Sequence, residues 1–423
     1  MRRLFKQPLV WILIVALLLR VAIALLLGNA IRGYSGAQDE ITYSMLGHRV
    51  AQGFGLTFPT NWYPWIKANA PQSYFSDTIS YYLAAIYTVF GYQPLVARLI
   101  TGLISTASVG LIYLLGARLF GRTVGLVAAG IAAVYAYLIY YGVTLVTEPL
   151  FIFALLVSML LTYSLLDRPN TWKWLALGAA LALAVLLRMA VVFFVVPLLV
   201  WLAWRLKQQR WHALIPLLVI ALAVAPFTIQ NYQTWGRFLL LEANFGHVFW
   251  NGNHPDSLGN FHPYRVFPIP PDVLALNNDV DITNELLRRG IQNVLNDPGM
   301  FVMLTITRLR EFFLFWPTTE SDLFANLLRV FSFGLMWPFA AAGLWLSRRQ
   351  WRDLLPIYIF MVMHTGVYAV TWTMIRYRIP LDAFLIPFAA VAGVQLYSWI
   401  AASRRRKGDA AALAPVASSA QGR

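Results

Sequence analysis

Residues 9–27 read LVWILIVALLLRVAIALLL, an apolar run long enough to cross a bilayer and interrupted by one charge, Arg20. Two adjacent carboxylates follow where the chain leaves the lipid, in Gln38-Asp39-Glu40. In an arbitrary loop such a pair would most simply be solvated. A further acid, Glu148, lies at another predicted membrane exit, so that acids gather at one membrane face. The pattern therefore predicts a functional site at this face.

The composition indicates a polytopic membrane protein. Of the 423 residues, 59% are hydrophobic and 12% are charged, whereas soluble domains are about 25% charged. The chain has no cysteine, which excludes disulfides and thiolate chemistry. The basic residues before the run 9–27 resemble the start of a signal peptide, but the run is long for one and no clear cleavage site follows. We therefore interpret it as an uncleaved first span.

The positive charge is confined to the short segments between apolar runs and to the two ends. These hold 18 of the 33 Lys and Arg but only three of the 18 Asp and Glu, and the difference equals the net charge of +15. The segments are 1–6, 118–122, 167–173, 205–210, 348–353 and 403–423. By the positive-inside rule they are cytoplasmic, which places both termini inside and Asp39 and Glu148 outside. The charge therefore does not imply binding to nucleic acid.

The apolar runs predict an all-α bundle of about ten transmembrane helices. They fall at about 9–27, 94–117, 123–141, from Glu148 to 166, 174–187, 190–204, 212–229, 324–346, 354–373 and 381–401. Two larger outer loops, about 28–93 and 230–323, each carry an expected interfacial helix, at 79–90 and 299–316. The predicted transmembrane domain is thus 1–402, followed by a basic, disordered cytoplasmic tail, 403–423.

Asp39 and Glu40 are the first candidate catalytic residues. Transfer to a hydroxyl group needs a base that takes the proton as the new bond forms, and one carboxylate can do this while its neighbour positions a group or a cation. Glu148, in Thr147-Glu148-Pro149, is the third candidate. An acid there would also stabilise the start of a helix, and the two roles are compatible.

Arginines at the same predicted face are candidates for binding an anionic group. Arg376-Tyr377-Arg378 ends the ninth predicted span, and guanidiniums two residues apart can bind a phosphate from different sides. Alternatively they reach lipid headgroups, and Asp382 could neutralise one of them. Arg98 and Arg188 also fall at this face.

The remaining polar residues give weaker signals. Arg20 could extend to the lipid surface or pair with an acid. The long outer loop contains His247, His254, His262 and Asp256, whose spacings fit no standard metal motif. No cofactor is indicated with certainty, and a divalent cation is left open.

The order of short motifs resembles that of the integral-membrane GT-C glycosyltransferases, and among these the bacterial branch related to protein O-mannosyltransferases and aminoarabinose transferases. The motifs that carry the resemblance span most of the chain: Asp39-Glu40 with Tyr43 and Gly53, Ala97-Arg98-Leu99, Arg118-Leu119-Phe120-Gly121-Arg122, Thr147-Glu148-Pro149, Asn231-Tyr232, Gly252-Asn253 with Pro255, and Arg376-Tyr377-Arg378 with Pro380.

The resemblance implies a transferase of the cell envelope, in the plasma (inner) membrane. It would move a hexosyl or pentosyl group from a polyprenyl-phosphate donor to a lipid, glycan or protein acceptor on the outer face, with Asp39 as the catalytic carboxylate. The family usually has a basic residue or His followed by Pro-Pro before the interfacial helix. Here Ser76-Asp77-Thr78 occupies that place, so Lys67 or Arg376 becomes the candidate ligand of the donor phosphate.

The main alternative function is a transporter or flippase of a lipid-linked saccharide. Transporters tend to have internal repeats and broken helices near the membrane midplane, whereas this sequence has no visible repeat and its candidate residues lie at one surface. A scaffold without activity would not explain acids and arginines at one face. The transferase hypothesis expects Asp39, Glu148 and an arginine around one outer cavity that opens to lipid.

Overall fold

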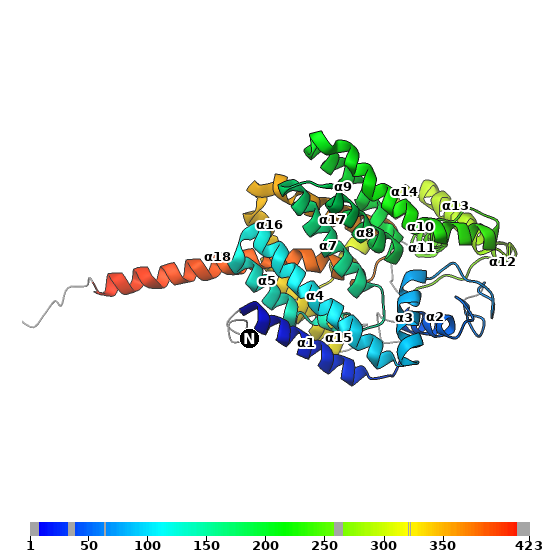
Figure 1. Ribbon diagram of the computed structural model, residues 1–423, viewed down its shortest axis with the longest axis horizontal. Helices are drawn as coiled ribbons and strands as arrows, with labels where there is room; N and C mark the ends of the chain where they lie inside the picture. Colours follow the sequence, from blue (N-terminus) through cyan, green and yellow to red (C-terminus); the bar gives the residue numbers. More distant parts are fainter. Residues whose placement is uncertain are drawn as a thin grey trace, which may run out of the picture.

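The computed structural model describes residues 8–32, 39–62, 65–257, 265–319, 321 and 323–412. These residues form helices joined by loops, and no strand occurs among them beyond one bridge between Thr57 and Pro71. The helices, drawn in Figure 1, are α1 Pro8–Leu27, α2 Asp39–Ala51, α3 Asp77–Phe90, α4 Pro94–Phe120, α5 Arg122–Val134, α6 Ala136–Tyr140, α7 Glu148–Asp167, α8 Thr171–Leu187, α9 Val192–Arg205, α10 Leu214–Trp235, α11 Phe245–Gly252, α12 Pro271–Leu274, α13 Asp279–Asn296, α14 Pro298–Phe312, α15 Leu323–Arg329, α16 Leu335–Leu346, α17 Trp351–Val370 and α18 Ile379–Ala412.

The predicted all-α polytopic membrane fold is confirmed. Within the described ranges, seven helical stretches are long and apolar enough to cross a membrane, and three shorter apolar helices lie at the other predicted spans. The shorter three are Arg122–Val134, Thr171–Leu187 and Met189–Arg205. The first of them is short because the predicted span 123–141 breaks at Tyr135, whose extended backbone (φ −68°, ψ 111°) separates α5 from α6.

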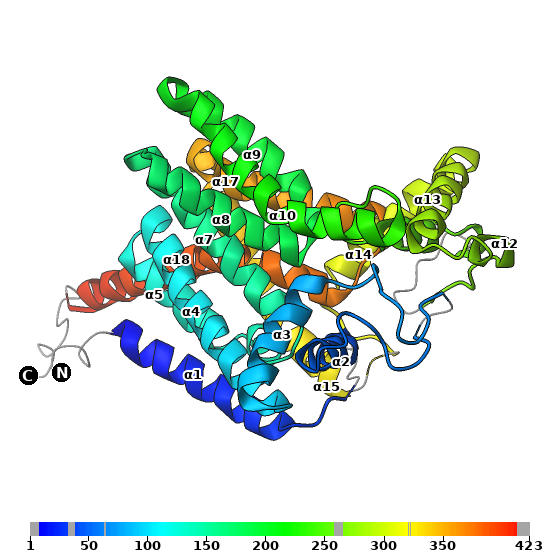
Figure 2. The same ribbon diagram turned by 45° about the vertical axis from the view of Figure 1, so that its right-hand side comes forward.

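Helix α18 is the centre of the bundle. Residues 379–392 are buried, and α18 packs against α4, α5, α7, α16 and α17. Figure 2 shows α18 beside α5 and α7. From Gly393 onward the helix leaves the bundle and projects from it at the left of Figure 1. The last span was expected to end at about 401 with a disordered tail from 403. In the structure the helix continues to Ala412, and 413–423 lie outside the described part.

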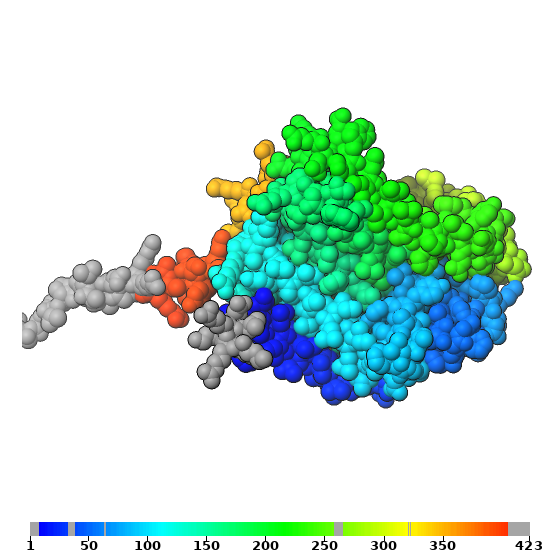
Figure 3. Space-filling model, in the orientation of Figure 1, coloured from blue at the N-terminus to red at the C-terminus, as the bar shows by residue number. Residues whose placement is uncertain are grey.

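The two outer segments meet at the end of the bundle that carries Asp39. Helices α2 and α3 pack on each other, as do α11 and α13, and both groups lie at the right in Figure 3. The amide of Ala243 donates to the carbonyl of Ser73 (2.7 Å), and the Ser73 hydroxyl donates to Asp279 (3.1 Å). These contacts join the segment between α2 and α3 to the segment that runs from the end of α10 to the start of α13.

Helix α14 has 15 residues and is not among the apolar helices of spanning length. Arg308 of this helix is buried, and it donates to the carbonyls of Gly252 (2.6 Å) and Ala369 (2.5 Å). It thereby fixes α14 to α11 and α17. Val302 and Ile306 remain exposed, as suits a helix lying along a lipid surface.

Single cysteines can test the predicted topology, because the chain has none of its own. If residues 299–316 do not cross, cysteines replacing Gln292 and Ser321 will both react with an impermeant thiol reagent added outside, and one replacing Gln350 will not. Gln292 and Gln350 are exposed and therefore accessible to reagent. Protection of the Ser321 position together with labelling at Gln350 would show that 299–316 crosses.

Candidate active site

Four charged side chains converge where helices begin or end at one end of the bundle. Asp39 is the first residue of α2 and Glu148 the first residue of α7, a position where the helix dipole stabilises a carboxylate. Arg188 directly follows α8, and Arg376 lies in the short 3-10 turn before α18. Of the predicted site residues, the structure brings these four together.

Arg376 bridges two carboxylates. Its Nη2 donates to Asp39 Oδ2, and its Nε lies 3.7 Å from Glu148 Oε1. The same Glu148 oxygen accepts from Arg188 Nη2 at 2.6 Å. The Asp39 side chain is 33% exposed, whereas those of Arg376 and Glu148 are 6% and 1% exposed. Asp39 is therefore the accessible carboxylate of the network, backed by buried positive charge.

Aromatic side chains hold the two guanidiniums. Those of Arg188 and Arg376 lie 5.0 and 5.1 Å from the centre of the Tyr377 ring. Arg188 also donates to the Tyr368 hydroxyl (2.9 Å), and the rings of Tyr368 and Tyr377 stack with centres 4.7 Å apart. The central residue of the predicted Arg-Tyr-Arg motif thus helps to orient an arginine from a different helix.

Glu40 and Arg98 form a separate, fully buried pair. Arg98 Nη1 lies 2.5 Å from Glu40 Oε1, and both side chains are 0% exposed. Arg98 also donates to the carbonyl of Val143, and the amide of Leu145 donates to Glu40. The pair fixes the buried bend 141–147, directly before Glu148. Because neither side chain reaches solvent, the structure places both outside the accessible site, where they can position its residues.

Arg378 does not join Arg376. It pairs with Asp382 (3.1 Å), donates to the Phe312 carbonyl (2.9 Å) and lies over the Phe333 ring at 3.4 Å. A 3-10 turn has about three residues per turn, so side chains two apart point in different directions. Contrary to the sequence-based prediction, Arg376 and Arg378 therefore do not come together to bind one phosphate. Lys67 is also away from the network: it is exposed and donates to Asn277 (3.2 Å).

Two acids near the network carried little signal in the sequence. Burial, and then the charge of Glu242, raises the pKa of Asp77 to about 8. Burial raises the pKa of Glu242 to about 7, although Asn244 and Arg188 favour its charged form. Asp77 lies within the stretch that departs from the family pattern, which could have drawn attention to it. Glu242 stands in no motif.

The described histidines of the long loop form no cluster with several acids, although His254 Nδ1 lies 3.8 Å from Asp256 Oδ2. His247 contacts the Tyr74 hydroxyl through Nδ1 (2.8 Å), and burial lowers its pKa to about 4. His254 stacks on Phe267, with ring centres 3.8 Å apart. His262 lies outside the described residues, among which no group of three His, Asp or Glu could hold a metal ion.

Two comparisons with known proteins give matches to this chain. Residues 78–230, from α3 into α10, match the family model described as dolichyl-phosphate-mannose-protein mannosyltransferase. The structure is also similar to the archaeal oligosaccharyltransferase AglB from Archaeoglobus fulgidus, solved with an inhibitory peptide and a dolichol-phosphate. That comparison has a TM-score of 0.57 and 14% identity, and covers 99% of this chain and 53% of that one.

The fold is that of the GT-C glycosyltransferases. Two further structures of the A. fulgidus oligosaccharyltransferase support this. The apo form gives a TM-score of 0.56 at 15% identity, covering 95% of this chain and 52% of that one. A form tethered to an acceptor peptide containing the NVT sequon gives 0.56 at 14%, covering 94% and 50%. The chain spans about half the length of these solved proteins, and no match is found among curated proteins.

Proposed function

We propose that this protein is a glycosyltransferase that moves a sugar from a polyprenyl-phosphate donor to an acceptor on the outer face of the membrane. The observation that carries the proposal is the network of Asp39, Glu148, Arg188 and Arg376, in which one accessible carboxylate stands beside buried guanidiniums. The match of residues 78–230 to a mannosyltransferase family and a similar protein solved with dolichol-phosphate support a lipid-linked donor.

Each residue of the network has a role in such a transfer. The acceptor hydroxyl attacks the anomeric carbon while Asp39 takes its proton. The bond from that carbon to the phosphate oxygen breaks, and the polyprenyl phosphate leaves with the electron pair. Arg376 and Arg188 stabilise the charge that develops on the phosphate. Glu148, which contacts both guanidiniums, fixes their positions.

The ion pair between Asp39 and Arg376 suggests how binding of the donor could free the Asp39 carboxylate to act as the base. In the ion pair, Asp39 Oδ2 accepts a hydrogen bond from Arg376 Nη2, so this oxygen is occupied. A donor phosphate that takes over this guanidinium would release Asp39 beside the reacting carbon. Arg376 would keep its position, because Glu148 remains 3.7 Å from its Nε.

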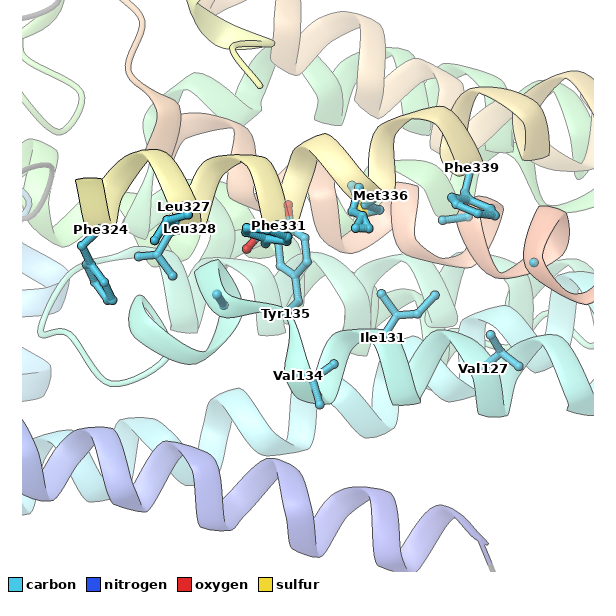
Figure 4. Close-up of a pocket in the computed structure, with 15 residues that line it drawn as sticks. Val127, Ile131, Val134, Tyr135, Phe324, Leu327, Leu328, Phe331, Met336 and Phe339 are labelled. Atoms are coloured by element: carbon cyan, nitrogen blue, oxygen red, sulfur yellow. The ribbon is translucent and has the colours of Figure 1, made fainter. Parts of the chain in front are cut away.

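A groove on the flank of the bundle offers a surface for the isoprenoid chain. It has a volume of about 590 Å³ and lies between α5, α15–α16 and α18. In Figure 4 the side chains of Phe324, Phe331 and Phe339 face Ile131 and Val134 across it. Its wall includes Tyr135, whose hydroxyl donates to Asp382 in the first turn of α18 (2.7 Å). The groove thus leads toward the turn that carries Arg376.

Filling this groove should impair long donors selectively. Gly393 lines the groove and has open space where a Cβ would stand, about 21 Å along α18 from Ile379. Gly393→Phe is expected to raise the KM for a full-length polyprenyl-phosphate sugar by about tenfold and to leave a short isoprenyl donor unaffected. Gly366→Phe, at an exposed glycine outside the groove, is the matched control. If Gly393→Phe leaves the KM for the long donor unchanged, or changes the KM values for both donors by the same factor relative to the wild type, the groove is not the chain site.

The direct test combines the cell and the purified protein. A deletion strain should lose a sugar from one envelope product and accumulate a lipid-linked sugar, which would identify the acceptor and the donor. Purified protein should then transfer that sugar from the accumulated lipid in detergent, without any membrane. Movement of the lipid across liposomes without transfer would instead establish the flippase alternative.

A further inference from the structure

Arg20 is a buried cation whose partners are all neutral. It lies within α1, is 1% exposed, and donates to Ser105 Oγ (2.8 Å) and to the carbonyls of Ala16 (3.0 Å) and Leu138 (3.3 Å). Across the described chain, no carboxylate lies within 4.0 Å of it. Burying a guanidinium inside the membrane region costs free energy unless an opposite charge offsets it. The acid closest to Arg20 is therefore the group that can offset this cost.

A small cavity separates Arg20 from Glu148. It measures about 10 Å³, close to the space of one water molecule, and both side chains line it. Ser105, Ser108 and Tyr141 add further polar groups to its wall, and Glu148 is the one acid among the lining residues. One water here would have enough hydrogen-bonding partners to be ordered.

One carboxylate oxygen of Glu148 can accept a further hydrogen bond. Its Oε1 accepts from Arg188 (2.6 Å) and lies 3.7 Å from Arg376. Its Oε2 has a single long contact, with the Thr147 hydroxyl at 3.4 Å. A carboxylate oxygen can accept more than this one weak bond, so Oε2 can take a water that Arg20 also binds.

We propose that Arg20 is a positioning residue of the site, joined to Glu148 through one ordered water in this cavity. This inference rests on the proposed function. Arg20 thereby adds a third positive charge beside those of Arg188 and Arg376. A sugar linked to its lipid through a phosphate is an anion, and an added positive charge near the site favours its binding.

A double-mutant cycle tests the Arg20–Glu148 link without reference to any reaction. Arg20→Gln and Glu148→Gln should each lower the melting temperature in detergent, because each removes one of the two charged groups that the proposed water joins. The double variant should lose less than the sum of the two shifts. Additive shifts would overturn the proposal, whatever happens to donor binding.

Donor binding provides the second readout, measured by titration with a polyprenyl monophosphate. Arg20→Gln should weaken binding on the order of tenfold, as expected for one charge acting in a partly desolvated site. Arg20→Lys should recover most of this loss because it keeps the charge. Arg118→Gln, which removes an exposed arginine that pairs with Asp167 outside the network, is the control and should bind normally.

Equal losses in Arg20→Gln and Arg20→Lys would mean that packing, and not charge, is responsible, and would overturn the proposed role. If the wild-type protein binds no polyprenyl phosphate, the proposed function fails on its own. The melting cycle would then still decide whether Arg20 and Glu148 interact.

Discussion

Asp39→Asn is expected to reduce transfer by about 10²–10⁴-fold, the contribution of a general base. Asparagine has the shape of aspartate and can still accept a hydrogen bond from Arg376, so folding should be unchanged. It cannot take the proton of the acceptor, which is the step that the proposal assigns to Asp39. The measurement is the kcat of purified protein with saturating donor and acceptor.

Asp281→Asn is a suitable control for this variant. Asp281 is an acid of the outer segments that pairs with an exposed arginine, Arg237, away from the network. Its amide variant should keep wild-type turnover. An Asp39→Asn protein with near-normal kcat would remove Asp39 from the catalytic role.

Arg376→Ala is expected to lower kcat/KM for the donor by about 10²–10³-fold, the usual effect of removing one donor that stabilises developing charge. The acceptor KM should change little, because the arginine is assigned to the phosphate. The measurement is initial-rate kinetics in which each substrate is varied in turn. Unchanged donor affinity and unchanged kcat would contradict phosphate binding by Arg376.

Arg378→Ala is the informative comparison, since the sequence alone suggested the same effect for both arginines. In the structure Arg378 neutralises Asp382, and both side chains are 0% exposed. Removing one partner of a buried ion pair typically costs about 3–5 kcal/mol. The variant should therefore show a lowered melting temperature or poor expression. Its folded fraction should bind donor with wild-type affinity.

Hydropathy and charge predicted the architecture well because both act on whole segments. Each predicted span has a helix, and the charged helix α14 is not among the apolar helices of spanning length. The exceptions depend on single residues. The break at Tyr135 interrupts an apolar run that reads as one span, and its hydroxyl bonds Asp382, 247 positions away. Hydropathy averaged over a stretch of neighbouring residues contains no information about a contact between residues so far apart in the sequence.

The site was predictable as a list of residues but not as a set of pairs. Asp39 and Glu40 are adjacent in sequence, yet successive residues on a helix point about 100° apart, so Asp39 faces the accessible side and Glu40 faces Arg98. Their neighbours are set by how α2 packs on the bundle. The same holds for Arg376 and Arg378, which share a motif and have different partners.

The Asp39–Arg376 pair also sets the order of events during synthesis. The two residues are 337 positions apart, so at about 5–20 residues per second Asp39 precedes its arginine by roughly 20–70 s. Glu148 and Arg188 are only 40 positions apart and can meet within seconds. The nascent chain therefore carries a half-assembled cluster with Asp39 unneutralised until the last helix is inserted. Ribosome pausing before α18 would prolong that interval. Membrane quality-control proteases would then encounter a chain whose charged cluster is still incomplete.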